Sequence, residues 1–434
     1  MTLYILAAIV ICIILGYTTK INIGLFAIAF SYLIGCFGMG LKAYEIIELW
    51  PLKIFFVIFA VTLFYNFPLA NGALEKLSNH LIYRCRHFPA FLPLIIFFVA
   101  TVVAGLGAGY YTVLATMAPM ILLLSKHTNL NIVIATLSVN YGALAGANFI
   151  TSQSGVIFRE LMRSAGVAND NSFTYILGVF AATFVIPVIL LGGYSVFNAK
   201  NSKISIETTM PEPFDSKQKQ SIMLIFIMMA TVLIVPILNL LMPQISAIEF
   251  LNARIDIGFI AVIFALISLF LKLGDERAVI ALIPWNTLIM ICGVGMLIRL
   301  GVEVGVIYEL TEWLSTNVPI WLIPTLVFVI SAIMSVFAST LGVVAPTLFP
   351  IVLPLAVASG ISPLLLFTCI VVGAQSSSLS PFSSGGSLML GASQVVIEKN
   401  KLFTALLFKA VPLDICVGII AILVIQLIFY KRKL

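Results

Sequence analysis

The stretch SVFASTLGVVAPTLFPIVLP, residues 335–354, lies inside a longer run from Trp313 to Ile397 that contains no charged side chain. A helix needs about 20 apolar residues to cross the ~30 Å hydrocarbon core of a bilayer, so this run is long enough for several passages. Of the 434 residues in the chain, 62% are hydrophobic and 9% are charged, whereas a soluble domain carries about 25% charged residues. The sequence therefore predicts an all-α integral membrane protein.

Two uncharged segments are too long for one passage and have a turn near the middle. Phe88–Ser125 would extend ~57 Å as a single helix, at about 1.5 Å per residue, and GLGAG at 105–109 is its turning point. The segment 319–357 turns near FASTLG at 337–342. Irregular backbone at membrane depth is tolerated where it lines a cavity. We therefore expect re-entrant hairpins at 88–125 and 319–357, and not pairs of full spans.

Each hairpin is followed by an apolar stretch that small and polar residues interrupt. The span at 130–158 contains GALAGANFITSQSG (142–155), and the span at 362–397 contains SSSLSPFSSGGS (376–387). A single serine, threonine or glycine in a span usually serves helix packing. Clusters of this density, with helix breakers among them, indicate broken spans instead.

The two halves of the chain are similar in the order and spacing of their motifs. INIGLFAIAF at 21–30 is identical to IDIGFIAVIF at 255–264 at five of ten positions, and WPLKIFF from Trp50 matches PWNTLIM around Trp285. The pair Ala118-Pro119 matches Ala345-Pro346. Each half is expected to cross the membrane five times. Five is odd, so the second half enters from the opposite side, and the repeats are inverted.

The predicted domains are a first repeat at 1–195, a polar linker at 196–219 and a second repeat at 220–434. Apart from the hairpins and broken spans, the predicted crossings are 3–19, 22–41, 54–71, 173–195, 220–244, 257–273, 279–298 and 402–430. Together with the broken spans they make about ten transmembrane helices. Amphipathic segments at 71–87 and 301–316 are expected to lie at the membrane interface.

The basic residues indicate the orientation. Of the 23 Lys and Arg residues, the larger share falls on the side of the linker and the segment 71–87. Cytoplasmic loops carry an excess of Lys and Arg, so we expect the first hairpin and the linker in the cytoplasm and both termini outside. The first apolar stretch lacks the marks of a cleaved signal. A multi-pass protein of the cell (inner or plasma) membrane is expected, with no nucleic-acid partner for its net charge of +6.

The two hairpin tips and the two broken spans are expected to meet near the membrane midplane. Half-helix N-termini there present unpaired N–H groups and positive dipole ends, which suit an anionic carboxylate. Hydroxyl and amide side chains add donors without burying a charge. The predicted substrate-binding residues are Thr112, Asn148, Thr151, Ser152, Ser335, Ser339, Thr340, Ser380, Ser383 and Ser384.

Titratable residues offer few other candidates. Asp414 is the one carboxylate well inside a predicted span, and a structural pair with Lys409 is expected. The three histidines lie in loops and the six cysteines are scattered, so no metal site or disulfide is expected. An intramembrane enzyme would need a set of His, Asp or Glu residues at depth, and none is visible.

These motifs give the chain a resemblance to the dicarboxylate carriers of the MatC type. The resemblance rests on INIGLFAIAFSYLIG, FPLANGALEKL and GANFITSQSG in the N-terminal half, and on SVFASTLGVVAPTLFPIVLP and SLSPFSSGGSLMLGAS in the C-terminal half. More distantly, the plan is similar to the divalent anion/sodium symporter family of the ion transporter superfamily. The resemblance implies an elevator-type homodimer, in which hairpins and broken spans move against a scaffold of the other spans.

In those symporters a Ser-Asn-Thr motif at each hairpin tip holds the substrate carboxylates and helps to coordinate sodium. The second tip of this chain has Ala338-Ser339-Thr340, whereas the first tip, GLGAGYYTV, has no such motif. The resemblance implies no cofactor and no metal other than Na⁺. The cation-binding positions that it suggests are Gly105, Gly107, Gly146, Asn148, Ser339 and Ser377.

Residues and resemblance together predict a secondary active transporter of small carboxylates, dicarboxylates above all, that is coupled to Na⁺ or runs as an exchanger, and not an enzyme. The alternative is a cation/proton or arsenite-type exchanger of the same superfamily. An exchanger of that kind is expected to carry an acidic residue in a break, and neither break has one. Specificity is expected to come mainly from the second half, where the hydroxyl groups gather.

Overall fold

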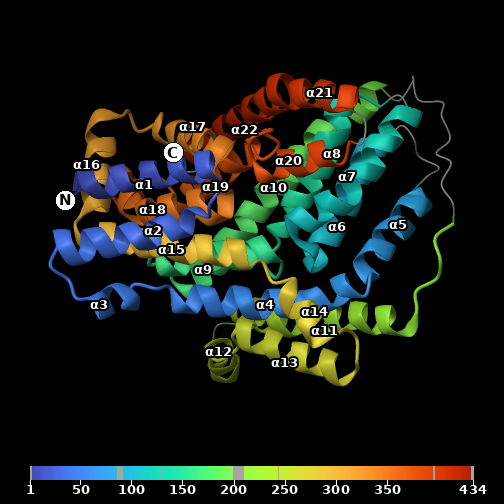
Figure 1. Ribbon diagram of the computed structural model, residues 1–434, viewed down its shortest axis with the longest axis horizontal. Helices are drawn as coiled ribbons and strands as arrows, with labels where there is room; N and C mark the ends of the chain where they lie inside the picture. Colours follow the sequence, from blue (N-terminus) through green and yellow to red (C-terminus); the bar gives the residue numbers. More distant parts are fainter. Residues whose placement is uncertain are drawn as a thin grey trace.

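The computed structural model describes residues 2–85, 91–128, 130–198, 210–242, 244–393 and 396–431, and every regular element in these ranges is a helix (Figure 1). The first half contains α1 (Thr2–Thr19), α2 (Ile23–Tyr32), α3 (Ala43–Glu48), α4 (Leu52–Ala70), α5 (Ala73–Cys85), α6 (Leu92–Val103), α7 (Gly109–Thr128), α8 (Ile132–Ala147), α9 (Gln153–Ser164) and α10 (Asn169–Asn198). The second half contains α11 (Ser216–Leu241), α12 (Ser246–Asn252), α13 (Ile257–Phe270), α14 (Glu276–Ala281), α15 (Trp285–Glu303), α16 (Val306–Asn317), α17 (Ile323–Phe337), α18 (Ala345–Ser359), α19 (Pro363–Ser376), α20 (Ser384–Gly391), α21 (Val396–Ala405) and α22 (Val411–Lys431). Short π-helical segments are η1 (Leu33–Gly38), η3 (Ala104–Ala108), η5 (Thr340–Val344) and η6 (Leu406–Ala410).

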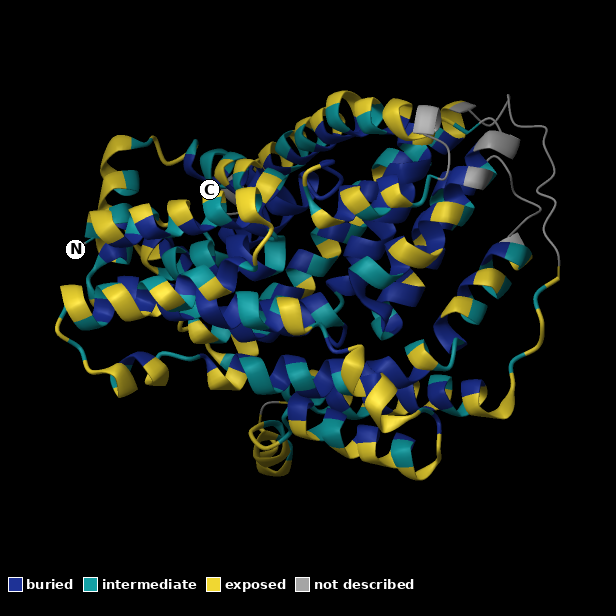
Figure 2. Ribbon diagram, in the orientation of Figure 1, coloured by how far each residue is buried: buried dark blue, intermediate teal, exposed yellow. Residues whose placement is uncertain are grey.

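The helices have the length and the surface of a membrane protein. Among the described residues, eight helices are long and apolar enough to cross a bilayer, and the bent pair of α12 and α13 brings the number to nine. Large apolar side chains such as Phe197, Phe259 and Phe270 are exposed, and Figure 2 shows exposed positions along the outer helices with buried ones facing inward. A soluble protein does not leave such surfaces in water. The predicted all-α, multi-pass membrane protein is confirmed.

The helix ends differ from the predicted crossings in several places. The crossing predicted at 279–298 is divided, because α14 ends at Ala281 and Pro284 precedes α15. Proline has no backbone N–H with which to continue a helix. The predicted interfacial segment 71–87 contains α5, and its last two residues lie outside the described ranges, as do residues 199–209 of the predicted linker.

The two broken helices are built in the same way. A side chain at Gly142 of α8 would collide with the carbonyl oxygen of Phe97, and one at Gly373 of α19 would collide with that of Phe328. Both members of the second pair lie 231 positions after the first (373 − 142 and 328 − 97). Glycine allows this close approach because it has no Cβ. Each broken helix therefore packs tightly on the first arm of its own hairpin, a relation that fits the predicted repeat.

Other helices pack across the two halves. Helix α2 lies along α15, and α13 lies along α4, so that each partner comes from the other half of the chain (Figure 1). Gly24 and Gly293 make the first of these contacts close, because a side chain on either would meet the backbone of the other helix. The start of α1 lies toward one end of the molecule with α3 and α16, and α5 lies toward the opposite end (Figure 1).

Candidate functional site

A cavity of about 360 Å³ lies where the turn at η3 between α6 and α7 (the first hairpin tip), the turn at η5 between α17 and α18 (the second hairpin tip), the broken helices and the loop between α1 and α2 meet. Its polar lining residues are Lys20, Asn22, Tyr110, Tyr111, Ser154, Asn286, Ser335, Ser339, Thr340, Gln375, Ser378, Ser383 and Ser384. Five of them are predicted substrate-binding residues: Ser335, Ser339, Thr340, Ser383 and Ser384. All five come from the second half of the chain.

The second hairpin tip and the second break both begin helical segments at the cavity. Ser339 Oγ accepts a hydrogen bond from Gly342 N at 3.2 Å at the start of η5, and Ser383 Oγ accepts one from Gly386 N at 3.2 Å at the start of α20. Serine is a preferred capping residue because its oxygen satisfies a free N–H of the first turn. These helix starts also carry positive partial charge. The second half therefore brings two capped helix starts to the cavity.

The first hairpin tip supplies a tyrosine that is tied to the broken helices. Gly107 and Gly109 have φ of 104° and 70°, values that glycine adopts readily, and α7 starts directly after this turn. The hydroxyl of Tyr110 donates to Asn140 Oδ1 at 2.8 Å, and Asn140 Nδ2 donates to Ser378 Oγ at 3.0 Å. This chain of contacts joins the first tip, α8 and the second break.

A second tyrosine of the first tip faces the predicted binding residues. Tyr111 lines the cavity together with Ser339 and Ser384. Tyr110 and Tyr111 thus bring hydroxyl groups to a tip that has no Ser-Asn-Thr motif. Neither residue was among the predicted site residues, although two tyrosines directly after a glycine turn in an uncharged segment are a visible signal.

Lys20 is the only charged residue among the described residues that line the cavity. It ends α1 in a left-handed conformation with φ of 62°, which is uncommon outside glycine. Its Nζ lies 4.4 Å from the centre of the Tyr17 ring, and this ring packs edge-on against Phe337 at 5.2 Å. Lys20 forms none of the ion pairs found in the described part of the chain. Lys20 was not among the predicted site residues.

Five predicted substrate-binding residues do not line the cavity: Thr112, Asn148, Thr151, Ser152 and Ser380. Asn148 is fully buried. It forms a reciprocal amide pair with Gln375, in which each side-chain N–H₂ donates to the oxygen of the other at 3.0 Å. Ser152 Oγ donates to the carbonyl oxygen of Ala104 at 2.7 Å, which ties the first break to the first hairpin. The polar groups of the first break are thus used largely within the protein.

The predicted cation-binding positions are only partly brought together. Gly105 approaches the backbone of Gly146, whereas Gly107 packs against an aromatic ring. Ser377 Oγ donates to a backbone carbonyl oxygen at 2.9 Å and lies outside the cavity lining, which includes Ser339. Within the described ranges, no group of three or more His, Cys, Asp or Glu side chains is placed to hold a metal ion.

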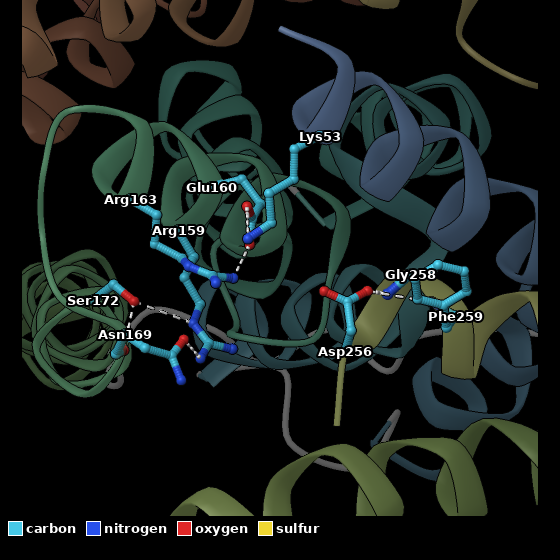
Figure 3. Close-up of polar contacts among 9 residues, drawn as sticks. All are labelled: Lys53, Arg159, Glu160, Arg163, Asn169, Ser172, Asp256, Gly258 and Phe259. Carbon is cyan, nitrogen blue, oxygen red and sulfur yellow. Dashed lines mark hydrogen bonds and ion pairs between the residues drawn. The ribbon is translucent and has the colours of Figure 1, made fainter. Parts of the chain in front are cut away.

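A charged cluster lies on α9, beyond the first break (Figure 3). The buried Glu160 accepts a hydrogen bond from Arg163 Nη1 at 2.7 Å, and its other oxygen lies 3.7 Å from Lys53 Nζ of α4. Arg159 points the other way and donates to Asn169 Oδ1 at 3.0 Å. Lys53 and Arg163 share the single carboxylate of Glu160, and this contact holds α9 against α4.

The prediction of a pair between Asp414 and Lys409 is wrong. Asp414 is 5% exposed, and its Oδ1 accepts a hydrogen bond from the hydroxyl of Tyr141 at 2.9 Å. Within the described ranges it forms no ion pair. Side chains five residues apart point about 140° away from each other around an α-helix, and η6 ends between these two positions. Lys409 is therefore turned away from the carboxylate.

Comparison with known proteins finds similarity in fold over most of the chain and similarity in sequence over its first third. Over 91% of this chain and 90% of the other, the fold is similar to the crystal structure of the Alcanivorax borkumensis YdaH transporter, described as having an unusual topology, with a TM-score of 0.55 and 16% sequence identity. No curated protein sequence matches the chain. Residues 1–147 match the family model of the dicarboxylate carrier protein MatC N-terminus, and the predicted resemblance to MatC-type carriers is thereby confirmed for this part of the chain.

Proposed function

We propose that the protein is a secondary active transporter of small carboxylates, dicarboxylates above all, and that the 360 Å³ cavity is its substrate site. The observation that carries the proposal is the charge of this cavity. Its described lining has one cation, Lys20, many hydroxyl and amide groups, and no acidic side chain. A site of this composition favours an anion with several oxygen acceptors, because hydroxyl and amide groups can donate to the acceptors and Lys20 supplies a counter-charge.

Two parts of the cavity lining suit the two carboxylates of such a substrate. One carboxylate is placed against Lys20, in the loop between α1 and α2. The other is placed at Ser339 and Thr340, with the capped helix starts behind them. Mutual attraction between an anion and a helix N-terminus supports this arrangement. The match of residues 1–147 to a dicarboxylate carrier family supports the same substrate class.

The transport mode proposed is an elevator motion of a homodimer, coupled to Na⁺ or run as exchange. Hairpins and broken helices form the moving unit, and α2, α4, α13 and α15 belong to the scaffold. The cavity lies at the contact between these two parts, because its lining takes Lys20 and Asn286 from one and the hairpin tips from the other. Carbonyl oxygens near Gly105 and Gly146 are the proposed sodium ligands of the first half.

Uptake into proteoliposomes tests the function. Radiolabelled malonate, succinate, malate and fumarate are offered with an inward Na⁺ gradient, with equal Na⁺, and with unlabelled substrate inside. Accumulation of at least one dicarboxylate above protein-free vesicles is expected. No accumulation of any of them in all three arms would refute the proposal.

Lys20→Met tests the placement of the substrate. Two unit charges 4 Å apart interact by about 4 kcal/mol at an effective dielectric constant of 20, and exposure of this lysine reduces the effect. A loss of substrate affinity of at least about tenfold is expected, which corresponds to about 1.4 kcal/mol. Lys272→Met is the matched control, because Lys272 follows a helix with nearly the same backbone conformation, φ 53°, and does not line the cavity. Equal affinities for the two variants would place the carboxylate elsewhere.

A binding measurement tests the second part of the proposed site, which is Ser339 and Thr340. Ligands that bind the folded state raise its melting temperature, so a dicarboxylate is expected to stabilise the purified protein in detergent. Ser339→Ala combined with Thr340→Ala should abolish this stabilisation. Unchanged stabilisation would show that the second hairpin tip does not hold the substrate.

A further inference from the structure

Asp414 is a buried carboxyl group for which the transport proposal has no use. It lies on α22 and is 5% exposed. One oxygen accepts the hydrogen bond from Tyr141 of α8, whereas Oδ2 has no hydrogen-bond partner among the described residues. Acidic residues inside membrane spans are rare and are usually kept for a function. An unpartnered oxygen on such a group calls for an explanation.

Asp414 borders a small cavity of about 30 Å³. This volume is enough for one water molecule, which needs about 10–15 Å³ on the same kind of measure. The wall includes hydroxyl or amide groups of Tyr141, Thr183, Gln375 and Ser376. These groups give a water molecule the two to four polar partners that it needs.

The helices around Asp414 offer a proton carrier but no counter-charge. Tyr141 is the titratable side chain of α8 at this site, and no acidic or basic group lines the small cavity from α10 or α19. Cys369 of α19 lies outside the lining, α17 has no titratable residue, and Lys409 of η6 forms no pair with the carboxyl group, as described above. An ionised Asp414 would therefore be a buried charge without a cation, which is costly. Binding a proton removes that cost.

The small cavity is adjacent to the substrate cavity. Leu144 and Gln375 belong to the walls of both. A negative charge on Asp414 would therefore repel an anionic substrate across the side chain of Gln375, and protonation would relieve the repulsion. Since coupling between two sites is reciprocal, a bound anion also favours the protonated carboxyl group.

We infer that Asp414 is a proton-binding site whose occupation is linked to substrate binding, so that each dicarboxylate carried is accompanied by one proton. The inference rests on the proposed function. A hydronium ion in the small cavity gives its proton to Oδ2, breaking one O–H bond and forming another, and leaves a water molecule and a neutral carboxyl group. The site adds a proton to the cargo whether transport is coupled to Na⁺ or runs as exchange.

The experiment is uptake into proteoliposomes with an inward gradient of one pH unit and no other gradient. If one proton accompanies each substrate molecule, the ratio of internal to external dicarboxylate should be about tenfold higher with this gradient than with equal pH on both sides. Asp414→Asn keeps the shape of the side chain and cannot release a proton, so it should still exchange internal for external dicarboxylate while losing the tenfold gain. Asp275→Asn is the matched control, because this exposed aspartate caps α14 and asparagine caps equally well. Its gain should remain.

A second variant keeps the inference testable if Asp414→Asn does not fold. Tyr141→Phe keeps the carboxyl group and removes its one hydrogen-bond donor, so the pH midpoint of dicarboxylate-induced stabilisation should move. The inference is overturned if the wild type takes up dicarboxylate but this uptake does not respond to the pH gradient. An unmoved pH midpoint in Tyr141→Phe overturns it as well. Absence of all dicarboxylate uptake and exchange instead refutes the proposed function itself.

Discussion

Replacing Asn148 by leucine tests the amide pair that joins the two halves of the molecule. Asn148 and Gln375 exchange two hydrogen bonds of 3.0 Å in a buried position. Each is worth about 1 kcal/mol net, and the Gln375 amide left without its partner adds about 1–3 kcal/mol. Asn148→Leu should therefore lower the free energy of unfolding by about 3–5 kcal/mol.

The assay is SDS-induced unfolding in mixed micelles, followed by tryptophan fluorescence. Asn317→Leu serves as the control, because Asn317 is exposed and bonds only its own helix, and its effect should stay within about 0.5 kcal/mol. Combining Asn148→Leu with Gln375→Met removes both polar partners, which is far less harmful than removing one. The double variant should thus be more stable than either single variant. Additive losses, or a single variant as stable as the wild type, would refute the role given to this pair.

Other contacts lead to three shorter predictions. Gly373→Ala should lower the melting temperature, because the new methyl group would collide with the carbonyl oxygen of Phe328 and overpacking costs about 1–3 kcal/mol, whereas Gly193→Ala, which has open space around it, should not. Glu160→Gln should destabilise the protein by about 1–3 kcal/mol in chemical unfolding, since it removes the charge-assisted hydrogen bond from the half-buried Arg163 and the contact with the exposed Lys53. Tyr111→Phe should weaken dicarboxylate binding by up to about tenfold in titration calorimetry, through loss of one hydroxyl donor, and unaltered affinity would remove this residue from the site.

Much of the fold was accessible from the sequence because the bilayer imposes strict rules. Long uncharged segments had to be helices, and glycine clusters inside them had to be turns or breaks. The boundaries were less accessible. The division of the predicted crossing at 279–298 depends on Pro284, whose effect on a helix end is local and was outweighed by the apolar pattern around it.

The residues of the candidate site could be predicted from the sequence only in part, for a different reason. The serines of the second half could be predicted, since a polar cluster in an apolar run has few other uses. Asn148 belongs to a similar cluster, yet its amide is paired with Gln375, which is distant in sequence. Lys20 reaches the cavity from a segment whose sequence gives no local sign of a site. A sequence lists the polar groups, but only the packing decides which of them face one another and which face the cavity.

The crossed packing of α2 with α15 and of α13 with α4 has a consequence for how the molecule is made. Each of these pairs takes one helix from each half of the chain. During synthesis, α2 therefore cannot form its contact with α15 until the second half has been made. A half-length chain would leave that groove open and would complete it only by joining a second half-length chain. Two fragments, residues 1–198 and 210–434, expressed together should therefore assemble, while each alone should not. The same geometry suits an origin in which two separate copies were partners before they became one chain.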